Sequence, residues 1–76
     1  MLNEQEKELF GKVAWTIYKK GHLTIDAILR FNPGVGKKDI KKFIKLGLLV
    51  KHRTDTFELS SFGRVLGFRY NKKFGK

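Results

Sequence analysis

Two histidines, each followed closely by a carboxylate, are the first candidates for catalytic or metal-binding chemistry. His22 precedes Asp26, and His52 precedes Asp55. A histidine beside a carboxylate can form an acid–base pair or supply two metal ligands, but a structural zinc site needs four ligands. No third ligand lies within motif distance of either pair, and the chain has no cysteine. We therefore expect no catalytic residue, no metal and no cofactor, and we expect that the protein is not an enzyme.

The segment Gly-Val-Gly-Lys-Lys, residues 34–38, contains part of a phosphate-binding loop pattern. The complete pattern has a glycine five residues before the second glycine, and a serine or threonine after the lysine. Phe31 and Lys38 occupy those two positions, and no buried strand precedes the segment. The sequence therefore predicts no nucleotide site at this loop.

The basic residues offer another chemistry, which is the binding of an anionic polymer. The 76 residues include 17 Lys and Arg against 7 Asp and Glu, which gives a net charge of +10. Residues 37–53 carry seven basic residues and one acidic residue, and residues 64–76 carry five basic residues and no acidic one. Charge concentrated in this way favours a binding surface over a general role in solubility.

A helix of unusual composition is predicted over about residues 37–46. On a helical projection, Ile40, Phe43 and Ile44 fall within about 100° of one another and form an inner stripe. Its outer face carries lysines four residues apart, and such like charges destabilise a helix. We therefore expect an external anion to relieve the repulsion between these lysines. The predicted outer face consists entirely of lysines, namely Lys37, Lys38, Lys41, Lys42 and Lys45.

Periodicity and capping residues predict the elements before this helix. A first helix is expected over residues 3–20, with Asn3 as its N-cap. Trp15 falls opposite its apolar stripe, where a tryptophan is either an ordinary surface aromatic or a contact to a subunit or ligand. A short extended bridge over residues 22–24 leads to a second helix over residues 24–31.

The elements after the basic helix are a hairpin and a final helix. A two-stranded hairpin is expected over about residues 48–59, with its turn at residues 54–55, and apolar and polar residues alternate in its second strand, residues 56–59. The last helix begins at Ser60 or Ser61, and residues 71–76 are expected to form a loose basic tail after a single domain of residues 1–70. Four residues are predicted to line its inner face: Phe62, Val65, Leu66 and Tyr70.

This order of elements resembles the winged helix-turn-helix family of DNA-binding domains. Residues 40–66, IKKFIKLGLLVKHRTDTFELSSFGRVL, carry the resemblance, because Gly47-Leu48-Leu49 and Leu59-Ser60-Ser61-Phe62-Gly63 stand where the family pattern places them. The resemblance implies an α+β fold that is mainly α. Its three-helix core is followed by a two-stranded wing hairpin and a C-terminal helix. It also implies that residues 37–46 are a recognition helix in the major groove and residues 51–56 the wing.

Duplex DNA is the expected partner, and a small transcriptional regulator or architectural factor is the expected role. The outer face of the basic helix has no Arg, Asn or Gln, which read base edges through paired hydrogen bonds. Phosphate contacts are therefore expected to dominate. The expected binding residues are Lys37, Lys38, Lys41, Lys42, Lys45, Lys51, Arg53, Arg69, Lys72 and Lys73.

Two alternatives stay open. One is an RNA- or ribosome-associated module on the same fold, although single-stranded RNA is usually bound by exposed aromatics that the basic helix lacks. The other is a protein-interaction adaptor of a polymerase or viral assembly. A homodimer is also a candidate state, with Trp15 and Phe68 as candidate subunit contacts. No targeting signal or membrane span is recognisable, so we expect no membrane partner and a cytoplasmic protein, nucleoid-associated if cellular.

Overall fold

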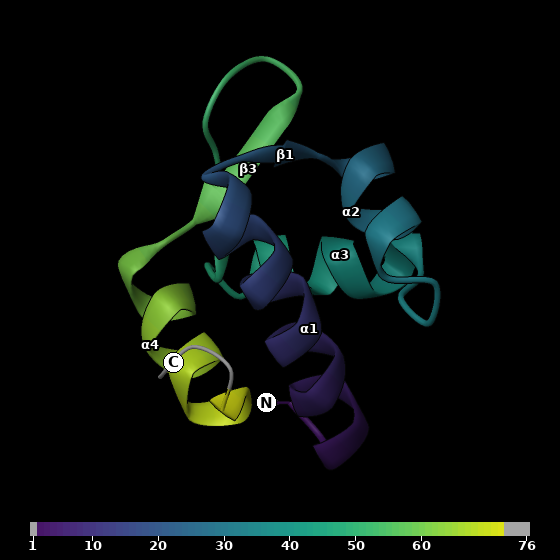
Figure 1. Ribbon diagram of the computed structural model, residues 1–76, viewed down its shortest axis with the longest axis vertical. Helices are drawn as coiled ribbons and strands as arrows, with labels where there is room; N and C mark the ends of the chain where they lie inside the picture. The colour runs from purple at the N-terminus through teal and green to yellow at the C-terminus, as the bar shows by residue number, and fades with distance from the viewer. Residues whose placement is uncertain (1, 73–76) are drawn as a thin grey trace.

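The computed structural model describes residues 2–72, and within them the chain forms four helices and a three-stranded antiparallel sheet (Figure 1). The chain is therefore a mainly helical α+β domain. The elements in order are α1 (Glu4–Lys20), β1 (Leu23–Thr24), α2 (Ile25–Phe31), α3 (Lys37–Lys45), β2 (Leu49–Lys51), β3 (Thr56–Leu59) and α4 (Ser61–Tyr70).

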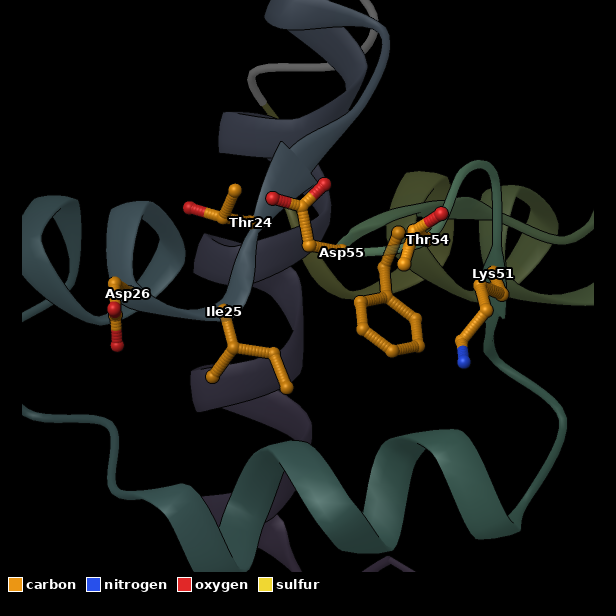
Figure 2. Close-up of a pocket in the computed structure, with 7 residues that line it drawn as sticks. Thr24, Ile25, Asp26, Lys51, Thr54 and Asp55 are labelled. Atoms are coloured by element: carbon orange, nitrogen blue, oxygen red, sulfur yellow. The ribbon is translucent and has the colours of Figure 1, made fainter.

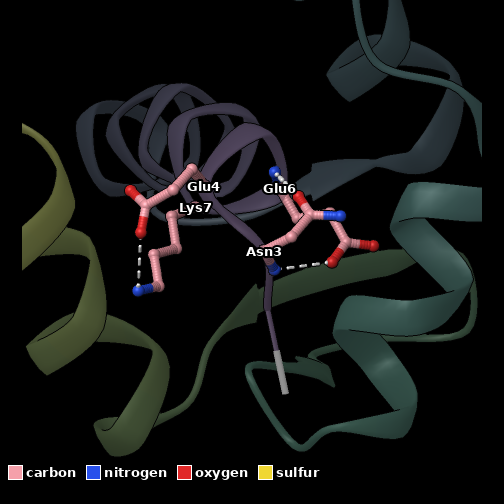
Figure 3. A network of polar contacts seen from close by, with 4 residues as sticks. All are labelled: Asn3, Glu4, Glu6 and Lys7. Atoms are coloured by element: carbon pink, nitrogen blue, oxygen red, sulfur yellow. Dashed lines mark hydrogen bonds and ion pairs between the residues drawn. The ribbon is translucent and has the colours of Figure 1, made fainter.

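The predicted N-cap fixes the start of α1, and a glycine ends the helix. The Asn3 side chain accepts a hydrogen bond from the Glu6 backbone N–H at 2.8 Å, and the Glu6 carboxylate accepts one from the Asn3 N–H at 3.0 Å (Figure 3). Gly21 ends the helix with φ 91°, a conformation that a residue with a Cβ atom adopts only with strain. The predicted apolar stripe of α1 faces inward, with Phe10, Val13, Ala14 and Ile17 buried and Leu9 partly buried against the core.

The core is built from residues of all four helices together with β2 and β3. Phe10 of α1 and Phe43 of α3 are both fully buried, and their rings pack edge to face with centroids 5.0 Å apart. Ile28 from α2 and Leu49 from β2 are buried in the same cluster. The apolar face of the basic helix is therefore part of the core, which leaves its other face outside.

The short strand β1 adds a third strand to the predicted hairpin. The strand order is β1-β3-β2, and Leu23 pairs with Phe57 while Thr24 pairs with Thr56. The sequence predicts only an extended bridge at residues 22–24, so the expected two-stranded hairpin is corrected to a three-stranded sheet. This pairing brings the start of α2, which Thr24 caps, close to the hairpin loop of residues 52–55.

The end of α3 and the start of α4 are joined by backbone and side-chain hydrogen bonds. Gly47, with φ 78°, lets its own N–H and that of Leu48 bond back to the last turn of α3 at 3.0 and 2.9 Å. Ser60 caps α4 by accepting from the Gly63 N–H at 2.9 Å, and its hydroxyl donates to the Gly47 carbonyl. These contacts fix the end of α3 relative to the start of α4.

The inner face of α4 differs from the predicted one. Phe62 and Val65, which were expected inside, are exposed, whereas Gly63 and Gly67 are buried. A Cβ atom at Gly63 would collide with the carbonyl oxygen of Leu48. The glycine therefore allows α4 to lie directly on the backbone of the chain, and this close approach turns Phe62 and Val65 outward. The other two predicted residues do face inward.

The chain after α4 is held against α1 at its first residue. The Asn71 side-chain amide donates to the Gly11 carbonyl at 2.9 Å, so Asn71 is not loose as the sequence analysis expected. Most of the predicted tail, residues 73–76, lies outside the described residues. Within residues 2–72, no helix combines the length and apolar character needed to cross a membrane.

Candidate nucleic-acid interface

The outer face of α3 is basic, and four of its five lysines are exposed. Packing of Ile40 and Phe43 into the core fixes the rotation of the helix about its axis. Among residues 2–72, none of the four exposed lysines has its ammonium nitrogen within 4 Å of a carboxylate oxygen. The four exposed lysines are Lys37, Lys38, Lys41 and Lys45.

The carboxylate of Asp39, in the first turn of α3, points to the N-terminus of that helix. Asp39 accepts a hydrogen bond from the Gly36 backbone N–H at 2.9 Å, which satisfies one of the donors left free at the N-terminus of α3. A negative charge in the first turn also interacts favourably with the helix dipole. Asp39 is therefore hydrogen-bonded at the start of its helix, and within residues 2–72 it forms no ion pair with a lysine.

Lys42 does not share the exposure of the other lysines. Its ammonium nitrogen lies 2.7 Å from Glu6 Oε2 on α1, and the Glu6 side chain is only 19% exposed. The hydrogen bond from Lys42, together with one from the Asn3 backbone, holds the pKa of Glu6 below its usual value. The sequence analysis grouped Lys42 with the other four lysines of the outer face, and its ion pair with Glu6 distinguishes it from them. The pair joins residues 36 positions apart, and no local pattern indicates it.

The hairpin supplies a second group of cations beside α3. Lys51 ends β2 opposite Phe57, and Arg53 follows in the loop, with both side chains exposed. The loop is closed by hydrogen bonds from the His52 and Arg53 N–H groups to the Thr56 carbonyl, at 2.8 and 3.4 Å. Neither Lys51 nor Arg53 is ion-paired within residues 2–72.

A groove runs between the hairpin and α3. One part, of about 380 Å³, is lined by residues of β1, α2 and the hairpin, among them Lys51 and Asp55 (Figure 2). A second part, of about 240 Å³, reaches Lys37 and Lys41 on α3. The two parts share Ile25 and Asp26, and Figure 2 shows the Ile25 side chain pointing towards α3. The groove thus connects both groups of cations, but two carboxylates also line it.

The histidines pair with each other rather than with the aspartates suggested by sequence spacing. The rings of His22 and His52 are stacked with centroids 4.1 Å apart, and His52 Nδ1 lies 3.1 Å from Glu58 Oε2. The pairing of both β1 and β2 with β3 brings these residues together, which spacing along the chain does not reveal. Within the described residues, no group of three or more His, Cys, Asp or Glu side chains is arranged to hold a metal ion.

The C-terminal basic residues lie apart from this groove. Arg69 is in the last turn of α4 and Lys72 follows it, and both are exposed. This end of the chain packs on α1 near Gly11, and Figure 1 shows α4 on the opposite side of α1 from α2. The structure therefore does not bring Arg69 and Lys72 together with the lysines of α3. Lys73 lies outside the described residues.

Trp15 and Phe68 are connected through a residue that the sequence analysis did not single out. Trp15 is partly buried against the core, rather than fully exposed, and stacks on Tyr18 with ring centroids 6.1 Å apart. Tyr18 also packs edge to face on Phe68, again at 6.1 Å. The two expected subunit-contact residues therefore belong to one row of aromatic side chains that crosses from α1 to α4.

Comparison of the chain with protein-family models, with characterised proteins and with solved structures finds no match. We therefore infer a function from the geometry of the chain itself.

Proposed function

We propose that the protein binds duplex DNA through α3 and the hairpin loop, as a winged helix-turn-helix protein whose contacts are mainly to phosphates. In this proposal α3 is the recognition helix, residues 51–56 form the wing, and the role is that of a small transcriptional regulator or architectural factor. An α-helix with its side chains is about 10–12 Å across, which matches a B-DNA major groove about 12 Å wide.

The single observation that carries the proposal is the uncompensated charge of α3. Four lysines are exposed on one face, while the carboxylate of Asp39 caps the helix and that of Glu6 is used by Lys42. The remaining like charges repel one another along the helix. A row of phosphates would relieve this repulsion and release counterions on binding.

The hairpin supports the same partner because its cations extend the basic surface. Lys51 lines the groove that continues to Lys37 and Lys41, so one anionic strand would contact both elements. The exposed α3 side chains carry no amide or guanidinium group, which favours backbone binding over base reading. Modest sequence preference follows from this chemistry.

The test is duplex binding by a variant that lacks three α3 lysines, Lys37→Ala/Lys41→Ala/Lys45→Ala. We expect its slope of log affinity against log salt to be shallower than that of the wild type by about 2.7, equally on two unrelated sequences. The control Lys12→Ala/Arg30→Ala/Arg64→Ala removes the same charge from exposed positions outside α3, and its slope should change by less than about 1.

An equal decrease of the salt slope in the two variants would show that net charge, rather than α3, determines binding. Parallel titrations with duplex RNA and with an acidic peptide test the two alternatives. Tighter binding of duplex RNA than of duplex DNA would favour an RNA-associated module. Binding of the peptide without measurable affinity for either duplex would favour a protein-interaction adaptor.

A further inference from the structure

A cleft between α1 and the end of α2 combines aromatic and basic side chains. It has a volume of about 290 Å³, near the lower end of the range for small-ligand sites. None of its lining residues is acidic, whereas Asp26 and Asp55 line the groove beside α3. The lining consists of Trp15, Thr16, Lys19, Lys20 and Phe31.

This cleft opens on the side of α1 that faces away from α3. Phe10 of α1 packs on Phe43 of α3, so it marks the direction of the basic helix. Lys19 follows Phe10 by nine residues, which is a rotation of about 180° around an α-helix. The cleft and the α3 surface are therefore separate, and a substitution in one leaves the side chains of the other in place.

The two walls of the cleft are joined by a buried side chain. Asn32, 7% exposed, donates to the Ile28 carbonyl at 2.8 Å, and its side-chain oxygen lies 3.4 Å from Thr16 Oγ1 on α1. This connection holds the end of α2, and with it Phe31, at a fixed place beside α1. A site whose walls are already positioned loses less entropy when a ligand binds.

The lining has the chemistry that holds unpaired nucleotides. Phe31 is 54% exposed and offers a ring face for stacking, while Trp15, already stacked on Tyr18, forms the opposite wall. The Lys19 ammonium lies 5.6 Å from the centre of the Trp15 ring, and neither Lys19 nor Lys20 is ion-paired within residues 2–72. Base stacking on aromatics beside backbone-binding cations is the usual mode of single-strand recognition.

We propose that this cleft binds an unpaired nucleotide of a single-stranded nucleic acid, with the base against Phe31 and the phosphate at Lys19 and Lys20. The proposal is independent of duplex binding at α3, because it uses another surface. If both hold, the protein joins a duplex on one side to a single strand on the other.

Fluorescence provides the test, because Trp15 is the only tryptophan in the sequence and lines the cleft. Titration with short oligothymidylate and oligouridylate should quench its emission in a saturable way. Phe31→Ala should weaken binding about tenfold, whereas Phe31→Tyr, which keeps the ring, should bind as the wild type does. Tighter binding of one oligonucleotide identifies DNA or RNA as the source of the single strand.

Three outcomes would overturn the proposal: unchanged affinity in folded Phe31→Ala, loss of quenching in Lys37→Ala/Lys41→Ala/Lys45→Ala, and equal quenching by polyglutamate. Thermal unfolding of Phe31→Ala shows whether that variant is folded, and Phe31→Tyr supplies a second comparison if it is not. Duplex affinity is measured in parallel on the same variants. Retained quenching without duplex binding would reject the function proposed for α3 and support the single-strand site in the cleft. Duplex binding without quenching would support the function of α3 and reject the single-strand site.

Discussion

The ammonium nitrogen of Lys42 lies 2.7 Å from Glu6 Oε2, and this ion pair joins the middle of α3 to the first turn of α1. The same Glu6 carboxylate completes the capping box of α1 through its other oxygen, which accepts from the Asn3 N–H (Figure 3). One carboxylate therefore fixes the start of one helix and the position of another. The pair also divides the lysines of α3 into one structural residue and four with no carboxylate partner among the described residues.

Lys42→Ala and Lys41→Ala should differ in their effects although they remove the same charge from neighbouring positions. We expect Lys41→Ala to reduce the salt slope of duplex binding by about 1, since a phosphate contact is lost. Lys42→Ala should leave the slope nearly unchanged and lower the melting temperature, because it breaks the link to α1. Paired binding and thermal-unfolding measurements distinguish the two. A larger loss of slope in Lys42→Ala would show that Lys42 leaves Glu6 to bind the nucleic acid.

The ion pair also predicts a pH dependence of stability. Because the pKa of Glu6 is lowered in the folded state, its contribution is present above the unfolded value of about 4.3 and is lost as the pH falls through the folded value. The wild type should therefore be more stable than Glu6→Gln at neutral pH, and the difference should shrink below about pH 4.3. Urea unfolding at several pH values measures it, with Glu8→Gln as the control for charge. A difference that does not change with acid would contradict this account.

Gly63 should be intolerant of any side chain. A Cβ atom there would collide with the Leu48 carbonyl, and backbone cannot move aside as a flexible side chain can. We expect Gly63→Ala to lower the free energy of unfolding by about 1–3 kcal/mol, as measured by chemical denaturation. Gly34→Ala is the matched control, because a Cβ atom there has Leu9 as its neighbour at an ordinary 3.9 Å. Equal stability of the two variants would refute the close packing of α4.

The carboxylate of Asp26 should oppose binding of a phosphate strand in the groove beside α3. It lines both parts of the groove, near Lys37 and Lys41 in one part and Lys51 in the other. Asp26→Asn should raise duplex affinity about threefold, the effect of roughly 0.7 kcal/mol between unit charges about 6 Å apart in water. Glu8→Gln removes a charge from an exposed position on α1 and should leave affinity unchanged. Weaker binding by Asp26→Asn would mean that the carboxylate accepts hydrogen bonds from the bound partner.

Local signals were sufficient to predict the helices and the hairpin. The predicted N-cap at Asn3 is confirmed, and the caps at Thr24 and Ser60 and the left-handed Gly47 after α3 likewise depend on neighbouring residues only. The inward face of α3 was also predictable, since the periodicity of Ile40 and Phe43 specifies it.

Features that depend on contacts between distant parts of the chain were not predictable. The pairing of Lys42 with Glu6 requires α1 and α3 to cross, and the stacking of His22 on His52 requires β1 to join the sheet. The rotation of α4 was predicted wrongly because hydrophobicity favours Phe62 as an inner residue. The close approach at Gly63 outweighs that preference, and such an approach is visible only in three dimensions.

The salt dependence of duplex binding tests the central proposal most directly. If α3 and the hairpin loop engage about five phosphates, log affinity should fall against log salt with a slope of about −4 to −5. The slope should be the same on two duplexes of unrelated sequence, since the exposed α3 side chains are lysines. A slope near zero, or affinity that persists in about half-molar salt, would contradict a phosphate-dominated interface.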